Sequence, residues 1–231
     1  MPNIVKNTTF PGLLDLLAPH SCRGCGRIGS VLCNRCKNNI INAHSNICPK
    51  CKATKTKAKC SNCPDLPPTY IIGERSGTLS ELVHNLKYQS VRAAAKPLAE
   101  LLDVIVPEFK GKIVIVPLPT IAKHIRTRGL DHTYLVAKSF ANLRGKNYQV
   151  KSLLLRNQNT VQVGTDQKTR QRQASSAYKI NPKIKVDKNT TYLLLDDVWT
   201  TGASLRAGEK KLREAGAKKI KLAVLALSRI D

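Results

Sequence analysis

The chain has 231 residues, enough for one well-formed core and a small accessory module, and its 39 basic against 15 acidic residues give a formal net charge of +24. With 42% hydrophobic residues and no apolar run of 18 residues, the sequence argues for a soluble protein and against membrane insertion; its first residues lack the segments of a secretory signal, so we expect a cytoplasmic protein. The charge favours nucleic acid, an anionic membrane surface or phosphorylated metabolites as partners, although a generally basic surface would give the same total.

The first predicted element is a short amphipathic helix over residues 10–18, which Pro19 ends. All eight cysteines follow it, as four pairs with two intervening residues: Cys22 and Cys25, Cys33 and Cys36, Cys48 and Cys51, Cys60 and Cys63. A two-residue gap lets both thiolates of a pair point at one ion, and two pairs complete a tetrahedral zinc site. The sequence therefore predicts a small N-terminal double zinc ribbon with two structural zinc ions.

The pairing of these cysteines leaves alternatives. The short loops favour a sequential arrangement, in which the first two pairs form one site and the last two form the other; a cross-braced arrangement is the alternative. Disulfide bonds are a further alternative, which a reducing cytoplasm disfavours. Because a region this small and polar has almost no core of its own, metal must supply its folding energy.

Basic residues surround the last two cysteine pairs: Lys50, Lys52, Lys55, Lys57 and Lys59. Such a run suits contacts to a phosphate backbone, but a solvated face is the commoner explanation of a charge run. His20 and His44 also lie near the cysteines. Since eight thiolates already fill two zinc sites, we interpret both histidines as spectators.

A stiff segment over residues 64–68 marks the boundary between an N-terminal helix and double zinc ribbon at 1–66 and a second domain at 67–231. The second domain is predicted to begin with an edge strand, a helix and a longer helix, at 70–72, around 79–86 and at 91–105. A buried strand at 113–116 follows and ends in a rigid, exposed exit, Pro117-Leu118-Pro119-Thr120.

The segment Lys123 to His132 brings cations to the start of a helix that runs to about Leu143. Arg126 and Arg128 have the geometry to neutralise a phosphate through paired hydrogen bonds, or are surface arginines at a helix start. A long polar stretch from Leu153 to Tyr178 is typical of a mobile lid. A helix at 204–215 and a strand at 220–227 complete the β-α-β order of a parallel sheet.

The most informative stretch is Tyr192 to Ser204, which begins as a buried strand. Two acids, Asp196 and Asp197, stand where that strand is expected to end, before a Thr-Thr-Gly-Ala-Ser turn and a helix. Such a turn gathers backbone N–H groups, hydroxyls and the positive end of a helix dipole, which suits a phosphate. The acids fit the hydroxyls of a vicinal diol, so the pattern indicates a sugar phosphate. The alternative is a plain strand-to-helix turn in which Asp197 or Ser204 caps the helix.

These thirteen residues resemble the phosphoribosyl pyrophosphate (PRPP) signature of the type I phosphoribosyltransferases. The resemblance implies that the two acids hold the ribose 2′- and 3′-hydroxyls, that the turn cradles the 5′-phosphate, and that PRPP binds together with Mg²⁺. The implied PRPP-binding residues are Asp196, Asp197, Val198, Thr200, Thr201, Gly202, Ala203 and Ser204. Further candidates for contacts to the pyrophosphate or phosphate are Lys87, Leu118, Pro119, Arg126 and Arg128. Trp199 is predicted to lie in a solvated loop, where it stacks on a base or packs against a neighbouring loop.

The whole chain from Cys22 onward resembles the ComF/ComFC family of competence proteins. The resemblance rests on the four cysteine pairs, the PRPP signature and three further motifs, namely His84-x-x-Lys87-Tyr88, Val116-Pro117-Leu118-Pro119 and Arg126-x-Arg128-Gly129. It implies a double zinc ribbon joined to a Rossmann-like α/β phosphoribosyltransferase domain with a parallel sheet. One departure is Arg128-Gly129-Leu130-Asp131-His132, where the family usually has Arg-Gly-Phe-Asn-Gln, and a second is Gln173 in place of the usual Asn; both affect contacts on the base or acceptor side.

Two functions follow from the resemblance. One is a competence factor that handles incoming single-stranded DNA through its zinc ribbons and basic surface, binds PRPP, and has a DNA-uptake helicase or recombination proteins as partners. The other is an active transferase that moves ribose 5-phosphate from PRPP to a nitrogen acceptor. We favour the first; the aromatic content of 4% indicates backbone contacts more than base stacking.

Overall fold

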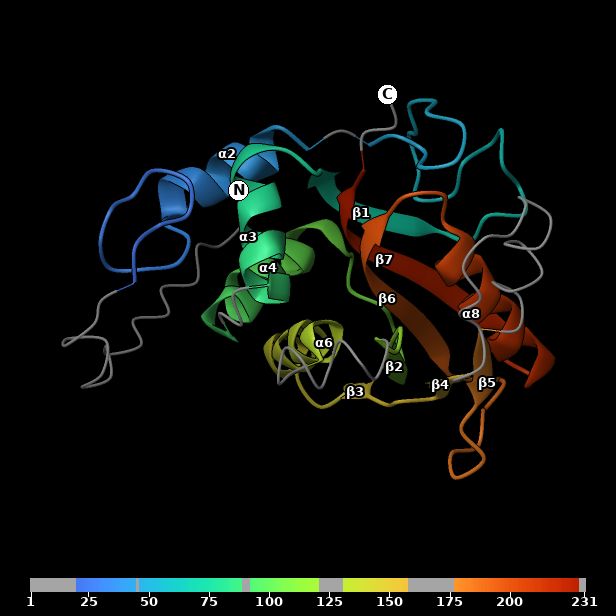
Figure 1. The fold of residues 1–231 in the computed structure, drawn as a ribbon. Coiled ribbons are helices and arrows are strands. Elements are labelled where there is room, and N and C mark those ends of the chain that lie inside the picture. The colour runs from blue at the N-terminus through green and yellow to red at the C-terminus, as the bar shows by residue number, and fades with distance from the viewer. Residues whose placement is uncertain (1–19, 45, 89–91, 121–130, 158–176, 229–231) are drawn as a thin grey trace, which may run out of the picture.

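The computed structural model describes residues 20–44, 46–88, 92–120, 131–157 and 177–228 (Figure 1). The helix predicted over 10–18, both Arg126 and Arg128, and most of the predicted lid lie outside the described residues. Within those ranges, no helix combines the length and the apolar character that crossing a bilayer requires.

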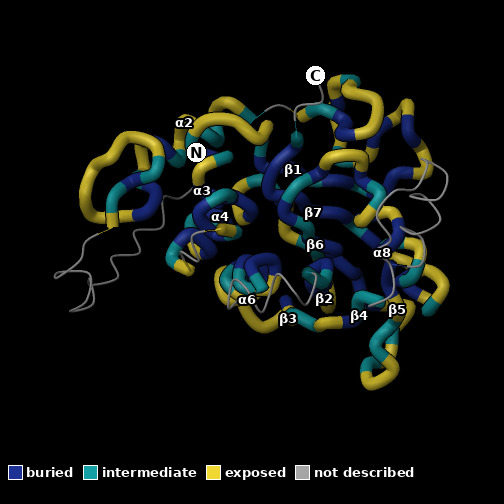
Figure 2. The backbone as a smooth tube through the Cα atoms, in the orientation of Figure 1, coloured by how far each residue is buried: buried dark blue, intermediate teal, exposed yellow. Residues whose placement is uncertain are grey.

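The centre of the fold is a five-stranded sheet whose neighbouring strands are all parallel, in the order β1-β7-β6-β2-β3. These strands are β1 (Thr69–Glu74), β2 (Ile113–Pro117), β3 (Tyr148–Val150), β6 (Thr191–Trp199) and β7 (Lys219–Leu227). The apolar runs of β2, β6 and β7 are buried, as a parallel sheet covered on both faces requires (Figure 2). The predicted α/β class and the edge position of β1 are confirmed. The short strand β3 was not predicted, because three residues carry no recognisable period.

Helices cover both faces of this sheet (Figure 1). One face packs against α3 (Gly77–Tyr88), α4 (Ala95–Ile105) with the short 3-10 turn η1 (Arg92–Ala94) before it, and α6 (His132–Arg144); α8 (Ala203–Glu214) packs against the other. Side chains of β2 alternate between the two cores, Ile113 and Ile115 on the first face and Val114 and Val116 on the second. A separate antiparallel pair, β4 (Leu154–Arg156) and β5 (Tyr178–Ile180), lies beside α8.

Strand β6 is longer than the sequence predicted, since it continues through both acids to Trp199. The last part of β6 is held by β7, where Val198 and Trp199 pair with Ala226 and Leu227. Trp199 is only 1% exposed, so the prediction that it lies in a solvated loop and offers a face to a base is wrong. Its ring packs on Gly202, where a Cβ atom would overlap the indole and where φ is +71°. This close approach explains the glycine in the turn.

The eight cysteines form two separate sets of four, one from the first two pairs and one from the last two. The sequential pairing is therefore confirmed. The first set precedes and overlaps α2 (Asn34–Asn42), and its Cys22 and Cys36 join the core under α3 and α4. In the second set, Cys48, Cys60 and Cys63 join the core on the α8 side. Each set thus extends a different one of the two cores on either side of the sheet.

The cysteine-rich region also covers the outer edge of β1, which pairs with β7 on its other side. Lys55 is 7% exposed, and its ammonium donates to the carbonyl oxygens of Thr69 at 2.9 Å and Ala58 at 3.4 Å. His44 lies with Nδ1 3.0 Å from the carbonyl oxygen of Ile72. The interpretation of Lys55 as part of a solvated or phosphate-binding run is therefore wrong: it satisfies a strand edge that would otherwise be open to other chains.

We predict that Lys55→Met destabilises the protein by about 1–3 kcal/mol, because the buried carbonyl group of Thr69 loses its donor, whereas that of Ala58 still accepts from the N–H of Thr69 at 3.1 Å. The matched control is Lys57→Met, a neighbouring lysine that is exposed, whose effect should stay within about 0.5 kcal/mol. Urea unfolding of the two variants measures the difference. Equal stabilities would show that the Lys55 contacts contribute nothing.

Candidate functional site

A cavity of about 330 Å³ opens at the carboxyl ends of the strands, where parallel α/β sheets bind ligands. We call it the carboxyl-edge cavity. It is lined from the ends of β1, β2 and β6, from α3, α6 and α8, and from the β4 and β5 pair, by Arg75, Lys87, Tyr88, Leu118, Pro119, Thr120, His132, Thr133, Arg156, Tyr178, Asp196, Asp197, Val198, Thr200 and Ser204.

Most of the residues singled out from the sequence meet in this cavity. They are Lys87, Leu118, Pro119, Asp196, Asp197, Val198, Thr200 and Ser204. Thr201, Gly202 and Ala203 form the turn behind Thr200 and the first residue of α8 and are not part of the lining. Arg126 and Arg128 stand outside the described residues.

The two adjacent acids point to opposite faces of the sheet, because side chains alternate along a strand. Asp197 faces the side of α3 and α6, where its Oδ2 accepts from Lys87 Nζ at 2.7 Å and contacts His132 Nε2. Burial alone would raise the pKa of Asp197, but the hydrogen bond from His132 and the charge of Lys87 lower it to about 2. Asp197 is therefore a carboxylate whose Oδ2 is already engaged within the protein.

Asp196 has a different environment. Its side chain is partly exposed in the carboxyl-edge cavity, and its Oδ1 accepts from the backbone N–H of Asp197 at 2.8 Å. Burial and the neighbouring charge of Asp197 raise the pKa of Asp196 to about 8. Among the described residues no cation forms an ion pair with it. Asp196 is thus the member of the pair that is open to a ligand, and hydroxyl groups or a cation would favour its charged form.

The turn after β6 supplies a second kind of chemistry. Thr200 and Ser204 present hydroxyls to the cavity, and Gly202 in the left-handed conformation starts α8 without a side-chain cap. Neither acid caps this helix, so the alternative of a plain capped turn is not what the structure contains. The N–H of Ala203 donates to the Thr201 hydroxyl at 3.4 Å, and the next N–H groups of the first turn and the positive end of a twelve-residue helix dipole remain at the turn. Together these groups can hold an anion beside Asp196.

Sequence reasoning missed the role of His132, which is 3% exposed. Asp131 is the N-cap of α6, with its side chain accepting from the N–H of Tyr134 at 3.2 Å, and His132 is the first residue of that helix. Its Nδ1 is buried and lacks a hydrogen-bond partner among the described residues. One sequence signal could have indicated this role. His132 ends the cationic segment and begins a predicted helix, a position from which a side chain can reach the carboxyl ends of the strands.

Three further lining residues carry polar groups. Arg75 directly follows β1, and Arg156 and Tyr178 come from β4 and β5, with the Arg156 guanidinium carbon 5.7 Å from the centre of the Tyr178 ring. Burial raises the pKa of Tyr178. The sequence predicted this part of the chain only as a lid, because the contact between β4 and β5 spans residues that carry no local pattern.

Both cysteine sets fit structural zinc. All four sulfur atoms in each set lie within 4.8 Å of one another, and the Sγ atoms of Cys25 and Cys33, and of Cys51 and Cys60, are 3.6 Å apart. Ligands about 2.3 Å from a tetrahedral zinc ion lie about 3.8 Å apart. Burial would raise the pKa of Cys22, but N–H groups that include those of Cys33 and Gly24 lower it to about 6. This is the arrangement that favours the thiolate a zinc ion requires.

Comparisons with known proteins add little to this geometry. No family model matches the chain, and no curated protein matches it. Among solved structures, a crystal structure of a hypoxanthine phosphoribosyltransferase from Staphylococcus aureus aligns with a TM-score of 0.30 and 10% identity, over 64% of this chain and 61% of that one. The alignment thus spans less than two thirds of that enzyme chain. A similarity this low carries no argument about ligands, which must come from the cavity itself.

The Asp197 contacts predict a characteristic dependence of stability on pH. The pKa of Asp197 lies below its ordinary value of 3.8 in the folded protein, so its carboxylate stabilises the fold above about pH 4, and this contribution is lost as the pH falls toward about 2. The difference in unfolding free energy between the wild type and Asp197→Asn should therefore be largest above about pH 4 and shrink below it. Urea unfolding between about pH 6 and 2.5 measures it.

Glu108→Gln is the control for this series, because Glu108 is an exposed acid in a loop away from the cavity. Its effect on the unfolding free energy should be small at every pH. A difference for Asp197→Asn that stays constant over the same range would contradict the assigned network.

Proposed function

We propose that the protein binds PRPP in the carboxyl-edge cavity and acts in the cytoplasm as a ComF-type factor that handles single-stranded DNA. The observation that carries the proposal is that Asp196, open to the cavity, lies beside Thr200, Ser204 and the free start of α8 in one space of about 330 Å³. In a pentose phosphate, the vicinal diol matches the carboxylate of Asp196, and the 5′-phosphate matches the hydroxyls and the helix start.

In this proposal the two acids have separate roles. Asp196 accepts from the ribose hydroxyls, which are the donors that a half-buried carboxylate needs. Asp197, held by Lys87 and His132, fixes the end of β6. It contributes negative electrostatic potential to the cavity from the side of α3 and α6. The resemblance implied that both acids grip the diol; the contacts of Asp197 support a direct role for Asp196 and an indirect one for Asp197.

The phosphate groups have their own partners. Thr200, Ser204 and the N–H groups at the start of α8 suit the 5′-phosphate. Arg75 and Arg156, which line the same cavity, are the described cations best placed for the pyrophosphate, a role that the sequence gave to Arg126 and Arg128. Lys87 is committed to Asp197 at 2.7 Å, so its charge acts mainly on that acid.

A magnesium ion fits the donor set of the cavity. Mg²⁺ takes oxygen ligands and is usually held by one or two carboxylates together with phosphate oxygens. Asp196 is the partly exposed carboxylate of the cavity. When bound, the ion would supply neutralisation of the charge on the pyrophosphate, and Asp196 would orient it toward the sugar hydroxyls.

Each cysteine set is proposed to hold one zinc ion, so that the N-terminal part is a zinc ribbon module of residues 1–66 attached to the α/β domain of 67–231. The proposed competence role rests on the resemblance to the ComF family and on the net charge of +24, which favours nucleic acid. A DNA-uptake helicase or recombination proteins are the partners that such a role implies.

The proposal predicts that PRPP with Mg²⁺ binds the wild type in calorimetry and binds Asp196→Asn about 10- to 100-fold more weakly. This range corresponds to the loss of a hydrogen bond to a charged group, about 1.5–3 kcal/mol. Glu108→Gln, which removes an exposed charge elsewhere, should bind as the wild type does. Unchanged affinity in Asp196→Asn, or no heat with the wild type, would remove the PRPP site.

A second candidate function is transfer of ribose 5-phosphate to a nitrogen acceptor. Tyr88 favours it, because it is 57% exposed, lines the carboxyl-edge cavity and packs against His84 with ring centroids 5.0 Å apart and planes tilted by 38°. An aromatic ring in that position suits a planar base as acceptor.

If the transferase is active, PRPP and Mg²⁺ with a suitable base or amine should release pyrophosphate, and Tyr88→Ala should raise the KM for an aromatic acceptor. A coupled pyrophosphate assay over a panel of acceptors measures both. If pyrophosphate is released without any acceptor, or is not released with any acceptor of the panel, PRPP binding and not transfer is the function.

A further inference from the structure

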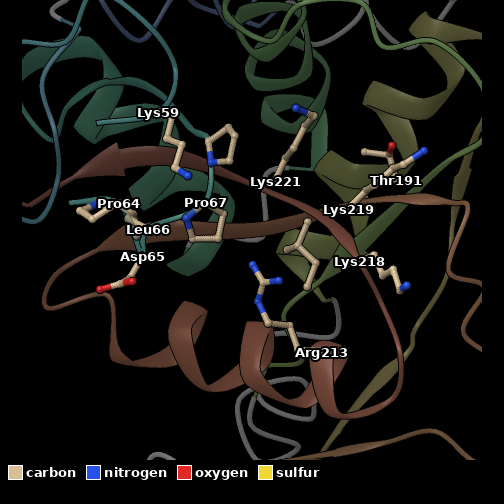
Figure 3. Close-up of a pocket in the computed structure, with 12 residues that line it drawn as sticks. Lys59, Pro64, Asp65, Leu66, Pro67, Thr191, Arg213, Lys218, Lys219 and Lys221 are labelled. Carbon is tan, nitrogen blue, oxygen red and sulfur yellow. The ribbon is translucent and has the colours of Figure 1, made fainter. Parts of the chain in front are cut away.

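A second cavity, of about 340 Å³, lies at the opposite edge of the sheet, where the strands begin (Figure 3). We call it the amino-edge cavity. It is bounded by the segment before β1, the starts of β6 and β7 and the end of α8, through Lys59, Pro64, Asp65, Leu66, Pro67, Pro68, Thr191, Arg213, Lys218, Lys219, Ile220 and Lys221. It shares no lining residue with the carboxyl-edge cavity, so the proposed PRPP site does not explain its composition.

The lining of this cavity is strongly basic: five residues are cationic and Asp65 alone is acidic. Figure 3 shows Lys59 reaching in from the cysteine-rich region and Arg213 from α8, toward the same space. Four of the cations come from the single stretch 213–221, at the end of α8 and the start of β7, and the fold brings Lys59 to them from a part of the chain about 150 residues earlier.

Three of these cations are without a partner of opposite charge in the described part of the chain: Lys59, Lys218 and Lys219, all of which are exposed. The other two are engaged. Arg213 Nε donates to Glu209 at 2.6 Å, and Lys221 lies 4.6 Å from the centre of the Phe109 ring. Unpaired cations around one hollow can neutralise the phosphates of a nucleic acid, which releases the counterions condensed on that nucleic acid.

Leu66, Pro67 and Ile220, all buried, also line the cavity. A positively charged groove tracks the phosphate backbone of a single strand, and because the lining holds no aromatic ring, contacts to the backbone and not base stacking would hold the strand here. A double helix, with its bases stacked inside, would leave the apolar side chains of the lining unused.

We propose that the amino-edge cavity is the binding site for the phosphate backbone of single-stranded nucleic acid. The inference rests on the DNA-handling part of the proposed function and assigns it a location. It refines the contact that the sequence suggested, because Lys55 of the basic run is buried against β1 whereas Lys59, another member of that run, lines the cavity.

The two cavities are far enough apart to act separately. Thr191 at the amino-edge cavity and Asp197 at the carboxyl-edge cavity are six residues apart on β6, or about 20 Å at about 3.3 Å per residue. One nucleotide cannot occupy both positions. PRPP and a short single strand should therefore bind together, without competition.

The test is fluorescence anisotropy of a labelled 20-residue oligothymidylate at several salt concentrations. The double variant Lys59→Glu/Lys218→Glu should bind at least about 10-fold more weakly, and the slope of log affinity against log salt should fall by about 1.4, the value for two phosphate contacts to a single strand. Both lysines are exposed, so folding should be retained. The control, Lys110→Glu/Lys138→Glu, changes two exposed lysines elsewhere by the same total charge.

Several outcomes overturn the proposal. Equal weakening in the two double variants would mean that total charge alone matters, and an unchanged affinity in Lys59→Glu/Lys218→Glu, or preference for a duplex of the same length, would place binding elsewhere. Displacement of the oligothymidylate by PRPP would assign it to the carboxyl-edge cavity. The PRPP site is tested separately. If it is wrong, the wild type shows no PRPP binding in calorimetry, whereas the oligonucleotide binding and its dependence on Lys59 and Lys218 are unaffected.

Discussion

The structure depends on one buried carboxylate, that of Asp197, on the lysine that neutralises it and on the histidine that contacts the same oxygen. A buried charge is costly unless it is paired, and Lys87 from α3 and His132 from α6 meet on the same oxygen. This contact ties two helices to the end of β6 on one face of the sheet. Asp196 lies on the other side of the strand and has no such partners among the described residues. The alternation of side chains along one strand therefore places one acid in contacts within the protein and leaves the other facing the cavity.

Each end of the sheet's strands carries a cavity with its own chemistry. At the carboxyl edge, an acid, hydroxyls and the start of a helix line a cavity suited to a sugar phosphate. At the amino edge, lysines and a few apolar side chains line the other cavity. The cysteine-rich region links these features, because Lys55 and His44 cover β1 and Lys59 reaches the amino-edge cavity. Its two cysteine sets extend the cores on opposite faces, so the region supports the sheet that carries both cavities.

Local patterns predicted the parts of this fold that repeat regularly along the chain. Apolar runs and helical spacing located β2, β6, β7 and the helices α3, α4, α6 and α8, and the two-residue gaps located both cysteine sets. Helix α2 was not predicted. The predictions failed where the partner was distant in sequence. The length of β6 depends on Ala226 and Leu227 of β7, the burial of Lys55 on the edge of β1, and the role of His132 on Asp197, 65 residues away. None of these contacts leaves a periodic signal near the residue concerned.

The central claim is that Asp196 recognises the diol of a pentose phosphate. Its most direct test compares the affinities of ribose 5-phosphate and 2-deoxyribose 5-phosphate, with Mg²⁺ present, by calorimetry. The two sugars carry the same phosphate and differ in one hydroxyl, so any difference reports on the carboxylate side of the cavity. The account predicts that the deoxy sugar binds at least about 10-fold more weakly, from the loss of one hydrogen bond to a charged group. Equal affinities would contradict it.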